Sequence, residues 1–187
     1  MEWLNHYSDA LTGVAALIAA GVAIYGVNEW KRQFKWRIEY ETARRYIRAL
    51  YRVREAINRD VRNPTISKSE FDGAKEAAEL NGSTVTDENR HWIVYLKRWE
   101  KLSAARVDLR AELLETEVLW GKDIGKAEWK LQLLIGELYA KIHMHFMNLQ
   151  NVTDSFDYLY YTDGQDEFSQ RVDKAIVGVE QLLRPHL

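Results

Sequence analysis

The residues Ala10–Val27 read ALTGVAALIAAGVAIYGV, and none of these 18 residues carries a charge. As an α-helix they extend about 27 Å, close to the hydrocarbon thickness of a lipid bilayer. The block that follows alternates aromatic rings with cations, which are the side chains that settle at lipid headgroups. We therefore expect a single transmembrane helix over about residues 10–27. Its interfacial residues are Trp30, Lys31, Arg32, Lys35, Trp36 and Arg37.

The charges on the two sides of this segment predict its orientation. No Lys or Arg precedes it, whereas four basic residues follow it within the interfacial block. The positive-inside bias then puts the N-terminus outside the inner (cytoplasmic) membrane of a bacterium and the rest of the chain in the cytosol. A cleaved signal peptide requires a basic segment ahead of the apolar stretch, and the chain has none there. The interfacial block also argues against a buried helix of a soluble protein.

The remaining sequence predicts an all-α fold. The chain has 187 residues, a net charge of -2 and 47% hydrophobic residues, which suits one globular domain with a real core. Its only prolines are Pro64 and Pro185, so long helices are expected. There is no cysteine, which excludes disulfides, thiolate zinc sites and cysteine nucleophiles.

The apolar periodicity and the capping residues divide the chain into a tail with the membrane helix, 1–29, and a cytosolic antiparallel helical bundle, 30–187. Ser67 with Glu70 three residues later forms a capping box. The last helix has Phe168, Ile176 and Leu183 on one face. The expected helices cover about 30–62, 68–80, 87–120, 124–150 and 166–183, the first continuing the membrane helix.

The membrane segment is rich in small residues, because 10 of its 18 positions are Ala, Gly or Thr. Small residues on one side of a helix let two backbones approach closely within lipid. We therefore predict self-association of the chain through this helix, although a segment of this composition also produces such a stripe by chance. The small-residue seam consists of Thr12, Ala16, Ala19, Ala23 and Gly26.

The helix expected over residues 30–62 is strongly basic, with a net charge of +7, while residues 63–187 carry -6. Two interpretations follow. The basic residues either bind an anion such as a nucleotide or nucleic acid, or pair with acidic residues within the bundle. Internal pairing is favoured, because the opposite charges of the two parts match closely. The candidate anion-binding residues are Arg44, Arg45, Arg48 and Arg52.

No pattern in the sequence supports catalysis, a cofactor or a metal site. His143 and His145 are two residues apart, so on a helix they face different directions, and a metal pair needs a spacing of three or four. The Asp- and Tyr-rich segment 153–167 does not match a calcium-binding loop. We interpret that segment as a loop held against the bundle, with a binding patch as the alternative.

Several motifs in the first third of the chain are similar to those of a known group of proteins. These are Trp30-Lys31-Arg32-Gln33, Tyr51-Arg52-Val53-Arg54-Glu55-Ala56-Ile57 and Arg62-Asn63-Pro64. With them the chain resembles a widespread set of bacterial single-pass membrane proteins with a basic juxtamembrane helix. The resemblance implies a bacterial inner-membrane setting, and it brings no activity, ligand or partner.

Two functional hypotheses follow from these features. The first is a membrane-anchored helical adaptor that is not an enzyme, with membrane lipid and either further copies of itself or another protein as partners. The alternative is a ligand-sensing membrane effector, of the kind used in antiphage defence, that oligomerises and perturbs the bilayer. Binding of an anion by the basic helix would support the second hypothesis.

Overall fold

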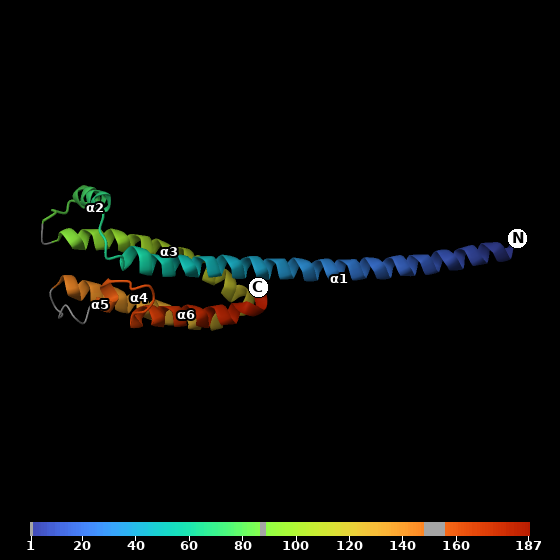
Figure 1. The fold of residues 1–187 in the computed structure, drawn as a ribbon. Coiled ribbons are helices and arrows are strands. Elements are labelled where there is room, and N and C mark those ends of the chain that lie inside the picture. The colour runs from blue at the N-terminus through green and yellow to red at the C-terminus, as the bar shows by residue number, and fades with distance from the viewer. Residues whose placement is uncertain (1, 87–88, 148–155) are drawn as a thin grey trace. The chain divides into compact units, whose positions relative to one another are not determined.

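The computed structural model describes the backbone of residues 2–86, 89–147 and 156–187, and the side chains of 17–86, 89–147 and 158–187. The described residues form helices and connecting turns without a strand, so the all-α prediction is confirmed (Figure 1). The elements are α1 (Glu2–Glu55), the π-helix η1 (Ala56–Val61), α2 (Lys68–Leu80), α3 (Arg90–Trp120), α4 (Asp123–Phe146), α5 (Phe156–Leu159), α6 (Glu167–Leu183) and the 3-10 turn η3 (Arg184–His186).

The chain divides into two compact units. The first contains residues 1–41 together with His186, and the second contains residues 42–185 together with Leu187. In the first unit the described backbone of residues 2–41 is α-helical. Helix α1 therefore contributes residues to both units, and the helical bundle belongs to the second.

Within the second unit, residues 42–55 of α1, α3, α4 and α6 lie side by side and alternate in direction (Figure 1). Helix α4 packs on both α3 and α6, and η1 packs on α3. The core between them holds apolar side chains from all four segments, among them Leu50, Leu102, Leu138 and Phe168. Helix α2 packs on α3 over a smaller cluster of its own. This arrangement is an antiparallel bundle of four helical segments. Helix α2 is inserted in the chain between η1 and α3 and packs on the outside of α3.

Capping residues explain where the helices begin. Ser67 Oγ accepts a hydrogen bond from the backbone N–H of Glu70 at 3.2 Å, and Asp166 accepts one from Ser169 N–H at 2.7 Å. Each supplies an acceptor to the first turn of its helix, where the backbone N–H groups have no partner in the helix itself. The beginning of α2 thus matches the predicted capping box, and α6 begins one residue after the predicted residue 166.

Helices α3 and α4 are shorter than predicted. Helix α3 begins at Arg90, after a turn in which Thr86 and Asn89 exchange side chain-to-backbone hydrogen bonds of 2.8 and 3.3 Å. Helix α4 ends at Phe146, and the predicted continuation to residue 150 lies mostly outside the described residues. Gly121 joins the two helices at φ 81° and ψ -172°, a conformation that is open only to glycine.

The apolar face predicted for the last helix is buried. Phe168, Ile176 and Leu183 of α6 are all at most 1% exposed. Leu96 of α3, in contrast, is 40% exposed. Arg98, two residues further on, takes the inward position instead and is fully buried.

Candidate functional site

The described part of the predicted membrane segment presents bulky apolar side chains over most of its circumference. Leu17, Ile18, Val22, Ile24 and Tyr25 are 63–75% exposed, and every residue from 17 to 28 is exposed. At 100° per residue these side chains, together with Val27, cover roughly 220° of the helix. An apolar surface of this width is favourable where it packs against other apolar groups.

Among the described residues, no helix is long and apolar enough to cross a membrane. The predicted span of residues 10–27 lies partly outside the described side chains, which begin at Leu17. The transmembrane helix therefore stays a prediction.

The small-residue seam occupies the sector that the bulky side chains leave open. Ala19, Ala23 and Gly26 are exposed, and a Cβ built on Gly26 would meet no atom within 4 Å. Thr12 and Ala16 lie outside the described side chains. The seam thus has small side chains, which allow close approach of a second helix, while the opposite side has bulky apolar side chains.

The interfacial block places aromatic rings on two different sides of α1. Trp30 stacks on Phe34 with ring centroids 5.6 Å apart, and Trp36 stacks on Tyr40 at 5.7 Å. Three of the cations, Arg32, Lys35 and Arg37, form ion pairs of 2.7, 3.7 and 2.9 Å with Glu29, Glu39 and Glu41 of the same helix. The three cationic side chains are 77–80% exposed, so water screens these pairs.

The four candidate anion-binding arginines are all exposed on α1. Two of them pair with acidic residues of α3. Arg45 binds Glu112 at 3.4 Å and also contacts Glu115, and Arg52 lies 3.7 Å from Asp108. These pairs follow the internal-pairing interpretation of the basic helix. Arg48 lines the shallow depression of about 320 Å³ between the two paired arginines, and Arg44 lies outside it.

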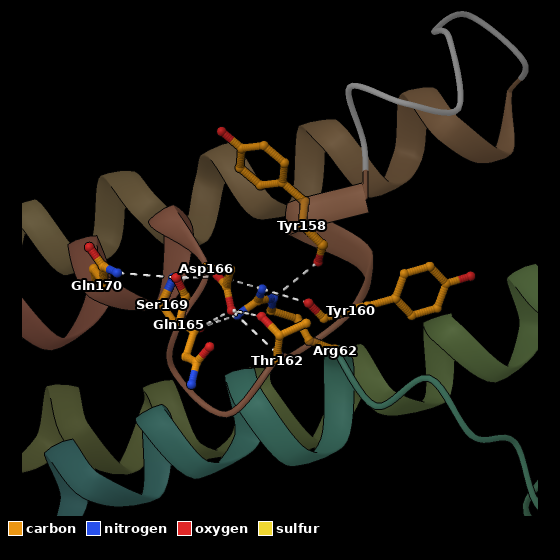
Figure 2. A network of polar contacts seen from close by, with 8 residues as sticks. All are labelled: Arg62, Tyr158, Tyr160, Thr162, Gln165, Asp166, Ser169 and Gln170. Atoms are coloured by element: carbon orange, nitrogen blue, oxygen red, sulfur yellow. Dashed lines mark hydrogen bonds and ion pairs between the residues drawn. The ribbon is translucent and has the colours of Figure 1, made fainter.

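A buried arginine at the end of η1 organises the C-terminal half of the bundle (Figure 2). The Arg62 side chain is fully buried and forms an ion pair of 2.8 Å with Asp166. It also donates to Ser169 Oγ at 2.7 Å, and to the backbone carbonyls of Tyr158 and Tyr160 at 3.2 and 2.9 Å. One guanidinium thus ties α5, the loop after it and the start of α6 to the end of η1.

Asp166 is the ionised partner in this network. Burial acts to raise the pKa of Asp166, but the hydrogen bonds from Ser169 and the charge of Arg62 outweigh it and hold that pKa below its usual range. Asp166 also accepts a hydrogen bond of 3.1 Å from Thr162 Oγ1. Residues 158–166 of the Asp- and Tyr-rich segment are therefore held against the bundle, and residues 153–155 lie outside the described part.

A second buried arginine holds the loop that follows η1. Arg98 of α3 forms a bidentate pair with Glu70 of α2 at 2.6 and 3.0 Å. It also donates to the backbone carbonyls of Asn63 and Thr65 at 2.5 and 2.6 Å. The hydrogen bonds from Arg98 hold the pKa of Glu70 below its usual range. Arg98 therefore joins α2, α3 and the loop between α1 and α2.

A third buried polar contact connects α1 to α4. The Tyr46 hydroxyl donates to Glu128 at 2.6 Å, and Gln132 donates to the same carboxylate at 2.8 Å. Burial, together with the neighbouring Glu128, raises the pKa of Tyr46 above its usual value, so the hydroxyl keeps its proton. Glu128 itself is 1% exposed, and these two uncharged side chains donate hydrogen bonds to its carboxyl group.

These buried polar residues were missed by the sequence analysis. Arg62 and Arg98 look like ordinary members of a charged surface, and Glu128 looks like any helix acid. The one available signal was the position of Arg98 four residues before the buried Leu102, on the inward stripe of α3. The guanidinium groups are surrounded by protein acceptors, which makes the arrangement structural.

Comparison of the chain with protein-family models, with curated proteins and with solved structures gives no significant match.

Proposed function

We propose that this chain is a membrane-anchored helical adaptor. Its helix over residues 10–27 spans the inner membrane of a bacterium, with the N-terminus outside, and its bundle docks proteins in the cytosol. The observation that carries the proposal is the exposed apolar surface of residues 17–27, which ends in the interfacial block of Trp30 to Arg37. The proposal assigns no catalytic step and no cofactor to the chain.

The distribution of side chains favours a helix that crosses the bilayer over one that lies in its surface. A helix in the membrane plane keeps its cations on one face and its apolar residues on the other. Here the apolar residues and the interfacial block succeed one another along the helix axis instead. This order matches the order of hydrocarbon and headgroups across one leaflet.

The alternative function, in which an anion is sensed by Arg44, Arg45, Arg48 and Arg52, has weaker support. Two of these residues are engaged by acids of α3, and an incoming anion would have to displace Glu112 or Asp108. The adaptor proposal requires no such exchange.

Membrane anchoring is tested by extraction of bacterial membranes with alkaline carbonate. We expect the full chain to remain in the membrane pellet and the Ala19→Arg variant to move to the supernatant. A basic residue at the centre of a membrane helix costs about 2.5–3.5 kcal/mol, and a segment so rich in Ala and Gly has little apolar surface to offset it. The matched control is Leu80→Arg, which places the same charge on an exposed residue of α2. Release of the unaltered chain by carbonate would contradict the proposal.

Self-association is the second part of the proposal, and native mass spectrometry of the full chain in nanodiscs tests it. We expect a defined homo-oligomer that dissociates when Ala16 and Ala19 are both replaced by Leu, because bulk on the seam separates the helix backbones. The control Gly21→Leu adds bulk on the opposite side of the helix and should leave the oligomer intact. A monomeric unaltered chain, or equal dissociation in the control, would exclude the seam as an interface.

A further inference from the structure

Helix α4 carries an exposed apolar ridge on the side that faces away from the core. Trp129, Leu133, Gly136 and Ala140 follow one another at steps of four and three residues, so they form one stripe on the helix. All four are exposed, and Trp129 and Leu133 keep 62% and 55% of their surface. Large apolar side chains exposed in a row indicate an interaction surface.

A groove lies on each side of this ridge, and Leu133 lines both of them. The groove between α4 and α6 has a volume of about 590 Å³, and the one between α3 and α4 about 550 Å³. The wall that α6 gives to the first groove contains Ala175, Val177 and Gly178. A Cβ built on Gly178 would meet no atom within 4 Å, so this wall leaves room for the backbone of another helix.

The rim of the α4–α6 groove is basic, although residues 63–187 as a whole carry a net charge of -6. Lys130 and Lys174 line the groove, are exposed and take part in no ion pair among the described residues. The remaining charges, Arg171 and Glu137, neutralise each other through an ion pair of 2.5 Å. The groove is thus an apolar floor between two exposed lysines.

We propose that the α4–α6 groove is the docking site for an amphipathic helix of a partner protein, with acidic residues on both sides of its apolar stripe. The apolar side chains of that helix pack against Leu133, Ala175 and Val177, and its carboxylates reach Lys130 and Lys174. This inference rests on the proposed adaptor function and adds the chemistry of the docked partner to it.

The charges and the shape favour this occupant over two others. A second copy placed on the same surface would bring Lys130 and Lys174 against the same lysines, and like charges across an interface are unfavourable. A lipid surface would rest on the projecting Trp129 and Leu133 and would leave the concave floor unfilled. An amphipathic helix with acidic flanks fills the groove with its apolar side chains and pairs its carboxylates with the lysines of the rim.

The test uses the full chain in phosphatidylcholine nanodiscs and two fluorescent helical peptides of about 18 residues. Both peptides carry a leucine stripe, flanked by Glu in the first and by Lys in the second. Fluorescence anisotropy should show the acidic peptide binding at least about tenfold more tightly than the basic one. Replacing both Lys130 and Lys174 by Glu should reverse this preference. The matched control, Lys68→Glu with Lys75→Glu on α2, makes the same change in net charge and should leave the preference unchanged.

Other outcomes overturn the inference. These are equal affinity for the two peptides, an equal effect in the α2 control, or undiminished binding by Leu133→Glu. A dimer that Leu133→Glu dissociates, without peptide binding by the unaltered chain, would assign the groove to a second copy instead. Because Leu133 and the two lysines are exposed, circular dichroism should show that the variants fold as the unaltered chain does. Carbonate extraction of Leu133→Glu separates the two proposals, since the anchor can fail or hold independently of the groove.

Discussion

Replacing Arg62 by Met is expected to lower the free energy of unfolding by about 3–5 kcal/mol, because it leaves the Asp166 carboxylate buried without its cation. The carbonyls of Tyr158 and Tyr160 also lose their donors. Urea unfolding of the full chain in mild detergent, followed by circular dichroism, measures the loss. The control is Arg59→Met in the same π-helix, where the side chain is 76% exposed and its ion pair with Glu55 contributes little.

A double variant shows whether the cost comes from the uncompensated charge. Asp166→Asn keeps a side-chain oxygen for the first turn of α6 and removes the buried charge. The variant Arg62→Met with Asp166→Asn should therefore recover part of the stability that Arg62→Met alone loses. If the double variant is as unstable as the sum of the two single variants, the two residues are not energetically coupled, and the ion pair does not explain the effect.

Replacing Arg98 by Met is expected to release α2 while the rest of the bundle stays folded. The substitution removes two hydrogen bonds to the Glu70 carboxylate and leaves the carbonyls of Asn63 and Thr65 without a donor. Hydrogen bonds to charged groups contribute about 1.5–3 kcal/mol, so amide protection in α2 should fall by roughly 10- to 100-fold. Hydrogen exchange measured by mass spectrometry reports this for each segment.

The experiment compares the amide protection of α2 with that of α6, because Arg98 forms hydrogen bonds to α2 and none of its described hydrogen bonds reach α6. A uniform loss of protection across both helices would mean that Arg98 stabilises the whole bundle and not the attachment of α2. Lys97→Met serves as the control. It lies next to Arg98 and donates one hydrogen bond to α2, to the Gly73 carbonyl at 2.8 Å, so protection in α2 should fall less than in Arg98→Met.

The periodicity of apolar residues predicted the bundle because burial follows the helical repeat closely in its long helices. The residues of α6 that share one face, from Phe168 to Leu183, are the residues it buries. The capping box of Ser67 and Glu70 is a local signal, and it predicted the start of α2 correctly. The end of α4 was predicted less well, because no glycine or proline marks it.

The role of Arg62 was beyond such patterns for a geometrical reason. At 100° per residue Arg62 lies about 100° away from Val61 and well off the buried stripe of α1. The chain instead winds as a π-helix from Ala56 to Val61, with a hydrogen bond from Arg62 N–H to the Ile57 carbonyl five residues back. This wider turn changes the register, so a charge expected on the surface points into the bundle.

The groove on α4 escaped the sequence analysis for a different reason. Apolar stripes were read as core, and Trp129 and Leu133 lie outside the stripe of Leu131, Leu134 and Leu138 that the core uses. Their exposure is a property of how α3 and α6 are spaced around α4, which a single-helix pattern does not contain. Likewise, the opposite net charges of two parts of the chain predicted internal pairing of the basic helix, but they did not identify α3 as the partner of Arg45.

The partners of Arg62 also set a limit on the order of events during synthesis. Ser169 lies 107 residues after Arg62 in the chain, and Asp166 lies 104 residues after it. When Arg62 leaves the exit tunnel of the ribosome, the apolar segment of residues 10–27 is already outside. The residues that accept hydrogen bonds from the Arg62 guanidinium have still to be translated. If residues 10–27 insert into the membrane as proposed, they are available for insertion well before the bundle can close. Until α6 leaves the ribosome, the Arg62 guanidinium is exposed to water, whereas in the folded protein it is fully buried.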